Sequence, residues 1–371
     1  MGANKLMAIA MGGHTTMDPS NPDKRIETQE GFMGEAVEKV VSDVSVLAAD
    51  GYRARLFTHG SGPQTQIIVR RAEISERAGM HPLPLRYASM DLIGSLGMTF
   101  QRLFVNALHR HPSGMAALGS GTRGVVTVPT SFVVNPLTMH PRKPIGSPLS
   151  DDEVAAKRKQ GQTVDDVDGK GMRVLVSSPN VLSTFPSDWE AIMACIRADL
   201  MAIAGGTGGV ALERVAGEFV ARDAVIDKDA AMARIVVDLA EGGVRFDVAA
   251  ILTDLPVMVR DFAAVRGDFE RVSRERGGLH KVPADELTGV LQAGKPIRRI
   301  AAADMMDILS RAKESGSVSG GAIPKMQAAC DMVDAGVRKA IICGLNNFGA
   351  TVTNPAADWA GTTVERGERW V

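Results

Sequence analysis

The stretch that decides the fold is LMAIAGGTGGVALERVAGEFVARDAVIDKD, residues 200–229. Its apolar first residues stop at four glycines, Gly205, Gly206, Gly208 and Gly209. This pattern is typical of a buried strand that ends in a phosphate-accommodating loop, because glycine lets backbone N–H groups approach an anion closely. Gly205 and Gly206 are therefore candidates for contact with a phosphate-containing ligand.

The end of the same stretch places a cation between two carboxylates. Lys228 stands between Asp227 and Asp229, directly before a helical pattern that begins at residue 230. A helix N-terminus carries roughly half a positive charge and unsatisfied N–H groups, so this terminus and the lysine are expected to share one phosphate. Lys228 and Asp227 are therefore candidate catalytic residues.

The composition is that of a globular enzyme. The 371 residues are 45% hydrophobic and 23% charged, which permits a large core and excludes a disordered or fibrous chain. The chain has 42 Lys and Arg against 43 Asp and Glu, so its net charge is −1. Neither nucleic acid nor a membrane is therefore expected as a partner.

Cysteine usage and the N-terminal sequence predict a cytoplasmic protein. Cys195, Cys330 and Cys343 lie in apolar surroundings without C-x-x-C spacing, which argues for reduced thiols and against structural zinc. The apolar run at residues 6–11 is too short for a signal peptide or a membrane span.

Residues 6–11 are also expected to form a buried strand that ends at Gly12, Gly13 and His14. In an open α/β sheet, ligands bind where the strands end, although a plain tight turn would also explain the glycine pair. His14 is accordingly either a structural residue of the turn or a residue that contacts the substrate.

The motif THGSGPQ, residues 58–64, follows a second strand pattern and is the most specific short motif of the N-terminal half. Gly60 and Gly62 flank Ser61, the proline fixes φ, and a helical pattern begins at once. The N–H groups of these glycines and of the first glycine pair are expected to converge on a small substrate pocket. His59 is more often a structural residue than a ligand in such a loop.

Nine short motifs together resemble the amino acid kinase superfamily, and its carbamate kinase branch in particular. In chain order they read GGH, THGSGPQ, KPIG, SSP, GGTGG, AVIDKD, ILTD, GGAIPK and GTTV. Where the family has asparagine, this chain has His14 and Ser61. The resemblance implies an α/β fold, a three-layer αβα sandwich around an open, mainly parallel sheet.

The resemblance also implies how the chain is divided. It predicts a single amino acid kinase domain over residues 1–371, with the acceptor bound by residues 1–204 and the nucleotide by residues 205–371. The segment 135–171 is rich in Pro, Lys, Asp and Gly, which predicts an insertion that protrudes from the sheet. By resemblance this insertion is a small lid subdomain.

The family's functional residues can be carried over at four further positions. Lys143 in KPIG is implied as a catalytic cation of the lid, and Lys325 in GGAIPK as a catalytic and nucleotide-binding cation. Thr253 and Asp254 in ILTD are implied as nucleotide contacts, although an ordinary turn after the strand is an equal alternative. By the same resemblance, Gly205 and Gly206 would contact nucleotide.

The implied activity is phosphoryl transfer between ATP or ADP, with Mg²⁺, and carbamate, run toward ATP in a cytoplasmic homodimer of nitrogen metabolism. This reaction depends on positioning and charge neutralisation. Lys143, Lys228 and Lys325 would offset the negative charge, while Asp227 holds a lysine or helps to place Mg²⁺. No further metal ligand is predicted from the protein, and another small carboxylate is an alternative acceptor.

Two other classes of protein remain possible. Gly206, Gly208 and Ala211 fit G-x-G-x-x-A, with the acidic Asp227 about twenty residues on, as in an NAD-dependent oxidoreductase. Residues 212–220, however, contain a glycine and favour a strand or hairpin over the helix that this motif requires. A nucleotide-binding protein without turnover is the other alternative.

Overall fold

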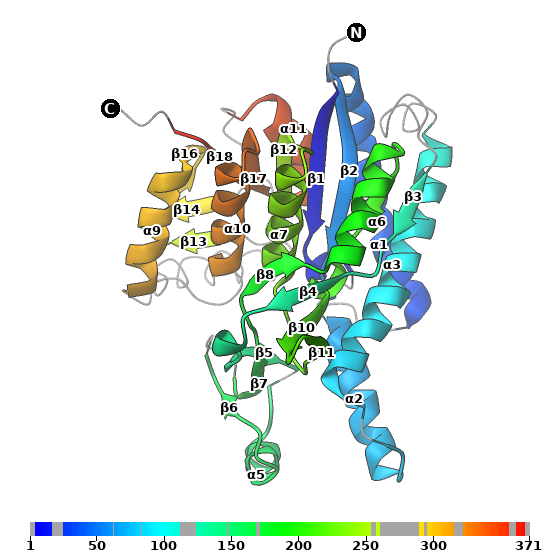
Figure 1. Cartoon of the computed structure of the whole chain (residues 1–371), viewed down its shortest axis with the longest axis vertical. Helices are drawn as coiled ribbons and strands as arrows, with labels where there is room; N and C mark the ends of the chain where they lie inside the picture. The colour runs from blue at the N-terminus through cyan, green and yellow to red at the C-terminus, as the bar shows by residue number, and fades with distance from the viewer. Residues whose placement is uncertain are drawn as a thin grey trace, which may run out of the picture.

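The structure is a computed structural model of the whole chain (Figure 1). It describes residues 4–16, 25–61, 63–81, 83–111, 124–146, 148–167, 171–253, 257–259, 289–292, 295–314, 322–355 and 361–367. No helix among these residues is long and apolar enough to cross a membrane.

The centre of the fold is an eight-stranded sheet in the order β16-β18-β17-β12-β1-β2-β9-β3. The strands from β17 to β3 in this order run parallel, and β18 pairs antiparallel with β17. Their bounds are β1 Lys5–Met11, β2 Tyr52–His59, β3 Val125–Thr127, β9 Met201–Ile203, β12 Val248–Leu252, β16 Arg299–Ala301, β17 Lys339–Cys343 and β18 Thr362–Glu365.

Strand β1 shows why the sheet is buried on both faces. Met7, Ile9 and Met11 belong to one hydrophobic cluster, whereas Ala8 and Ala10 belong to the cluster on the opposite face. All five are fully buried. Successive side chains of a strand point to opposite faces, so this continuous apolar run requires a layer of helices on each side.

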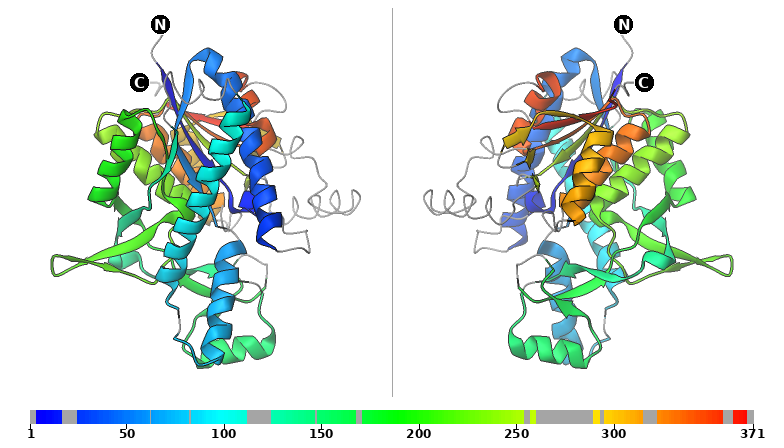
Figure 2. Two further views of the ribbon diagram at one scale, coloured as in Figure 1. Left: turned by 90° about the vertical axis from the view of Figure 1, so that its right-hand side faces the viewer. Right: turned by 90° about the vertical axis from the view of Figure 1, so that its left-hand side faces the viewer.

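Helices cover both faces of the sheet, as the side views in Figure 2 show. The cluster around Met7 is completed by α1 (Ile26–Leu47), α3 (Leu85–Arg110) and α11 (Phe348–Thr353). The other cluster is completed by α6 (Pro186–Arg197), α7 (Lys228–Glu241), α9 (Ala302–Glu314) and α10 (Ala322–Asp334). The expected three-layer αβα fold with a mainly parallel sheet is confirmed.

A second, four-stranded sheet follows the glycine loop below the central sheet (Figure 1). Its order is β11-β10-β4-β8, with β4 Ser131–Val134, β8 Val181–Thr184, β10 Val210–Val215 and β11 Glu218–Ala221. Because β10 and β11 form an antiparallel hairpin, the helix that a dinucleotide-binding G-x-G-x-x-A motif needs is absent at residues 210–221. The oxidoreductase alternative is therefore wrong.

The segment predicted to be a lid, and called the lid below, contains a third sheet in the order β5-β7-β6, with helix α5 at its end (Figure 1). Its elements are β5 Pro141–Ile145, α5 Asp151–Lys159, β6 Val164–Asp165 and β7 Arg173–Ser177. A capping box between Ser150 and Glu153 starts α5. Helix α2 (Pro63–Arg77), which follows the THGSGPQ loop, extends from the body of the protein toward α5.

The remaining elements are short. They are β13 Val257–Val259, β14 Val290–Gln292 and β15 Lys295–Ile297, which form one small sheet, and the 3-10 turns η1 Gly13–Thr16, η2 Ala48–Asp50, η3 Pro136–Thr138, η4 Gly206–Gly208 and η6 Leu345–Asn347.

Candidate active site

The two N-terminal glycine loops lie side by side, because β1 and β2 are parallel neighbours. The Gly60 N–H donates to Met11 O at 3.0 Å, and the Gly12 N–H donates to Leu252 O at 3.1 Å. Both N–H groups thus hold the loops to neighbouring strands. That Gly12, Gly13 and Gly60 contact the acceptor stays a prediction.

Three further acceptor-site predictions fall on this region. Ser61 Oγ lies 2.7 Å from Thr65 Oγ1, one turn into α2, so its hydroxyl helps to start that helix. His14 has its backbone in η1, but its side chain lies outside the described residues, as does Gly62. Of these three residues, Ser61 is therefore the one whose side chain the structure describes.

The N–H groups of the glycine loop are used within the protein. Gly205 N–H donates to Thr130 Oγ1 at 2.9 Å. Gly208 N–H donates to Gly205 O at 3.0 Å, and Gly209 N–H donates to Gly206 O at 2.9 Å. In the structure these three N–H groups therefore bond within the protein, and the contact of Gly205 and Gly206 with a nucleotide stays a prediction.

The loop needs glycine for close packing instead. A Cβ on Gly208, whose φ is +93°, would lie 2.0 Å from the carbonyl oxygen of Ile226. A Cβ on Gly206 would lie 2.5 Å from His59 Nε2. The loop thus packs between β2 and the residues that precede α7, and this close approach positions the N-terminus of that helix.

Asp227 caps α7, and its Oδ1 accepts the N–H of Asp229 at 2.9 Å. The carboxylate therefore satisfies one of the helix's free donors and faces the positive end of its dipole. Because the Asp229 N–H already donates to Asp227, it is not available to an incoming phosphate. The nearby ammonium groups must therefore supply most of the attraction for a phosphate.

Three lysines from three separate elements meet at this cap. Lys228, the first residue of α7, forms an ion pair with Asp229, whose other oxygen lies 3.1 Å from Lys325 Nζ in α10. Lys143 in the lid strand β5 lies 3.2 Å from Asp227 Oδ2. Three ammonium groups against two carboxylates leave one net positive charge, which suits an anionic ligand.

The cluster also touches the THGSGPQ loop, residues 58–64, which is called the acceptor loop below after its predicted role. A Cβ placed on Gly60 would lie 3.2 Å from Lys228 Cδ and 2.8 Å from Gly13 N. The stem of Lys228 therefore runs against the loop backbone, and its ammonium group lies between the N-terminal and C-terminal halves of the sequence. A larger residue than glycine at position 60 would separate them.

The charges perturb one another in opposite directions. Burial opposes ionisation of Asp227, but Lys143, Lys325 and Lys228 together hold the pKa of this carboxyl well below its usual range. Burial lowers the pKa of Lys228, Asp229 raises it, and Lys325 lowers it further. A bound phosphate would compensate the buried ammonium, so the site favours anion binding.

Sequence analysis assigned no role in the site to His59 or Asp229. The buried His59 ring packs against Phe100, and its Nδ1 lies 3.2 Å from Gly60 O. Burial lowers its pKa to about 4, and the nearby Lys228 acts in the same direction, so the ring is neutral at pH 7. The alternation of acid, lysine and acid in IDKD was the available signal for Asp229.

The predicted nucleotide end is only partly described. Thr253 follows β12, is 7% exposed, and donates its N–H to Cys343 O at 2.8 Å. This hydrogen bond fixes the residue at the same end of the sheet as the glycine loops. Asp254 lies outside the described residues.

A divalent cation would need phosphate ligands here. Within the described ranges, no group of three or more His, Cys, Asp or Glu side chains is arranged to hold a metal. Asp227 and Asp229 both pair with lysines. Mg²⁺ commonly binds through one or two carboxylates and the phosphates of a nucleotide, so these carboxylates fit such an ion only in that shared way.

Known proteins with similar sequences share one activity in their names. No protein-family model matches the chain. It is 35% identical over 233 residues to the carbamate kinase-like protein YahI of Escherichia coli K12, covering 61% of this chain and 68% of that protein. It is 25% identical to a carbamate kinase of Thermococcus kodakarensis, covering 92% and 94% of the two chains.

Solved structures agree on the fold. The carbamate kinase from Giardia lamblia bound to AMP-PNP superposes with a TM-score of 0.71 at 22% identity, covering 99% of this chain and all of that one. A structure from Aeropyrum pernix K1 superposes equally well, with a TM-score of 0.71 at 23% identity and coverage of 98% and 100%.

Proposed function

The chain belongs to the carbamate kinase branch of the amino acid kinase superfamily and is an ATP-dependent kinase, and we propose that it moves a phosphoryl group between carbamoyl phosphate and ADP. The relatives quoted above carry this activity in their names. The products of this transfer are ATP and carbamate, and we propose that the reaction runs in this direction, toward ATP. A different small carboxylate as acceptor is the second candidate, favoured by His14 and Ser61 at the acceptor loops.

The observation that carries the proposal is the lysine cluster beside the acceptor loop. Lys143, Lys228 and Lys325 come from the lid, α7 and α10, and Asp227 and Asp229 hold them together. Phosphoryl transfer needs positive charge around the moving group more than it needs covalent chemistry. A cluster with one net positive charge beside two glycine loops supplies that environment.

The lysines and Asp227 have different roles in the proposed transfer. A terminal oxygen of the ADP β-phosphate attacks the phosphorus of carbamoyl phosphate, and the bond from phosphorus to the carbamate oxygen breaks. Lys143, Lys228 and Lys325 offset the negative charge on the transferred group. Asp227 positions Lys143. No proton moves in this step, because the leaving carbamate is already an anion, so no general base is required.

Nucleotide binding is proposed at the C-terminal half. Lys325, Thr253 and Asp254, with Gly205 and Gly206 nearby, would contact ATP or ADP. Bound Mg²⁺ would neutralise charge on the nucleotide phosphates, and Asp227 is the protein group proposed to help place it.

A cytoplasmic homodimer is proposed for the assembly, with a role in nitrogen metabolism. Burial raises the pKa of the Cys330 and Cys343 thiols to about 12, so both stay protonated and unreactive.

On α3, Tyr87, Met90 and Met98 are 49%, 37% and 69% exposed. An apolar stripe at helical spacing beside the edge strand β3 supports contact with a second copy.

The decisive experiment is ATP formation from carbamoyl phosphate and MgADP, followed with a luciferase assay. Rapid ATP formation that depends on carbamoyl phosphate supports the proposal. MgADP binding in calorimetry without ATP formation would instead support either the second acceptor class or a nucleotide-binding protein without turnover. These two separate when MgATP and small carboxylates are tested for acyl phosphate, trapped as hydroxamate.

A further inference from the structure

A large cavity separates the lid from α2 and the start of α3. Its volume is about 1010 Å³, at the upper end of the range for sites that bind whole small molecules. The wall is more apolar than polar, and its apolar residues include Val69 and Ala72 of α2 together with Val174 and Val176 of the lid strand β7. Carbamate has only a few atoms and would occupy a small part of this space.

The cavity lies against the lid strands β5 and β7, and β5 also carries Lys143 of the candidate active site. Lys143 pairs with Val176 across the β5–β7 ladder, and Ile145 pairs with Val174. Residues two apart in a strand share a face, and directly paired residues share it too. Ile145, Val174 and Val176 line the cavity, so Lys143 lies on the same face of the lid as the cavity wall.

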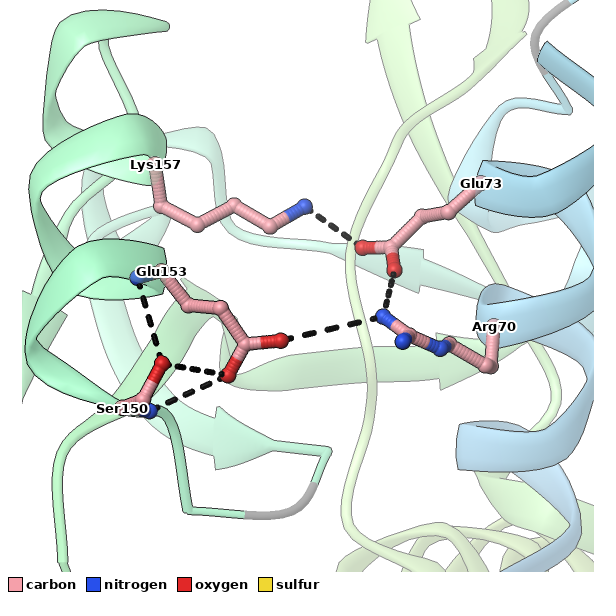
Figure 3. Close-up of polar contacts among 5 residues, drawn as sticks. All are labelled: Arg70, Glu73, Ser150, Glu153 and Lys157. Atoms are coloured by element: carbon pink, nitrogen blue, oxygen red, sulfur yellow. Dashed lines mark hydrogen bonds and ion pairs between the residues drawn. The ribbon is translucent and has the colours of Figure 1, made fainter. Parts of the chain in front are cut away.

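Four charged residues of the cavity wall form a network of ion pairs (Figure 3). Glu73 of α2 forms ion pairs with Lys157 of α5 and, at 3.3 Å, with Arg70. Arg70 also lies 3.9 Å from Glu153 of α5. These four charges compensate one another across the gap. Glu76, Gln160 and Gln162 are further polar residues of the wall, and the other lining residues are apolar.

We propose that this cavity binds the apolar substituent of an acid acceptor, while the acid group itself binds beside Lys143. The inference rests on the proposed function, which supplies the position of the reacting group. Within the second acceptor class named above, the carboxylates, it predicts that an acid with an apolar chain binds more tightly than an acid without one.

The chemistry is the same transfer with a larger acid. In the ATP-consuming direction a carboxylate oxygen attacks the γ-phosphorus of ATP, and the bond from that phosphorus to the β,γ-bridging oxygen breaks. The products are an acyl phosphate and ADP. No electrons are exchanged and no proton transfer is needed, because the carboxylate is ionised at pH 7.

The probe is the series of straight-chain carboxylates from acetate to hexanoate, titrated calorimetrically into the full chain in the presence of MgADP. Burial of one methylene strengthens binding by about fourfold, so the dissociation constant should fall by about that factor at each step. A dissociation constant that does not change along the series would overturn the inference.

Two tryptophan substitutions on α2 locate the effect. Ala72→Trp fills the cavity and should remove the dependence on chain length. Ile74→Trp is the matched control, because Ile74 is 56% exposed and does not line the cavity. In Ile74→Trp the dissociation constant should fall with chain length as it does in the wild type. Val69→Trp replaces Ala72→Trp if circular dichroism shows that the latter does not fold. A chain-length dependence that persists in the cavity-filling variant places the binding elsewhere and refutes the inference.

The ATP assay separates this inference from the proposed function. If wild-type protein makes ATP from carbamoyl phosphate but binds all carboxylates alike, the inference fails and the kinase assignment stands. If no ATP forms while chain length still governs binding and Ala72→Trp abolishes this, the carbamate assignment fails and the cavity remains an acid-binding site.

Discussion

Lys143 Nζ lies 3.2 Å from Asp227 Oδ2, although the two residues are 84 positions apart in the chain. The first belongs to the lid strand β5 and the second caps α7. Both side chains are only partly exposed, at 29% and 24%. This ion pair connects the lid to the N-terminus of α7, and the position of Lys143, a proposed catalytic cation, depends on a carboxylate that is distant in sequence.

Lys143 and Asp227 should therefore be energetically coupled in catalysis. Asp227→Ala removes the group that positions Lys143, so Lys143→Ala should cost less in that background than in the wild type. A coupling of about 1 kcal/mol in the transition-state free energy, roughly fivefold in kcat/KM, is expected from a double-mutant cycle. Steady-state ATP formation from carbamoyl phosphate and MgADP measures it.

Arg142 provides the matched control for this cycle. Its guanidinium contacts Ser178 O and Asn180 Oδ1. Arg142→Ala combined with Asp227→Ala should give additive effects. Additivity in the Lys143 cycle as well would show that the ion pair has no part in turnover.

Lys228→Ala should abolish most of the turnover and leave the fold intact. The ammonium group lies between the acceptor loop and the nucleotide half, so its loss removes charge stabilisation of the transferred group. Loss of one such preorganised group costs about 3 kcal/mol, or roughly a hundredfold to a thousandfold in kcat. Asp229 keeps Lys325 as a partner, so the carboxylate is not left unpaired.

The control for this substitution is Lys39→Ala, on the outer surface of α1, where Lys39 pairs with Asp43. It should keep full activity, and both variants should show the wild-type circular dichroism spectrum. Near-normal turnover of Lys228→Ala would end the assignment of Lys228 as a catalytic residue.

His59 should make the protein less stable in mild acid. Its pKa is lowered from 6.5 to about 4 in the folded state, so between these values the unfolded chain binds more protons. Stability is therefore full above pH 6.5 and falls as the pH drops toward 4. The contribution of this one group to the free energy of unfolding should fall by about 3 kcal/mol over that window.

Urea unfolding at pH 7 and pH 4.5 tests this. His59→Gln should lose less stability between the two pH values than the wild type, because glutamine does not titrate. His140→Gln is the control, since His140 is exposed, and it should follow the wild type. An identical acid response in His59→Gln would contradict the prediction.

Gly208→Ala should be severely destabilising. A Cβ at this position would meet Ile226 O at 2.0 Å, and the φ of +93° is unfavourable for alanine. Several kcal/mol of unfolding free energy should be lost, as is typical of backbone strain combined with a steric clash. Thermal unfolding measures it.

Gly31→Ala is the opposite case and serves as control. Gly31 lies in the interior of α1 with nothing within 4 Å of its added Cβ. Alanine should raise the free energy of unfolding there by about 0.5–1 kcal/mol. Equal effects of the two substitutions would show that the close approach at Gly208 is not what constrains the loop.

The sequence determined the fold class because burial of a strand and the position of a turn depend on residues that are close together in the chain. Met7 to Met11 had to be buried on both faces, and the hairpin at residues 212–220 was visible from its glycine. The same local reasoning named Lys228 and Asp227, since a helix cap depends on neighbouring residues.

Only the tertiary structure decided which groups meet and which donors are free. The glycines were expected to offer N–H groups, but Gly12, Gly60 and Gly205 donate to Leu252, Met11 and Thr130, partners that are distant in sequence. Asp229 joins Lys228 to Lys325, and Asp227 joins α7 to Lys143. Hydrogen bonds and ion pairs depend on distances of a few ångströms between elements, and a local pattern carries no information about those distances.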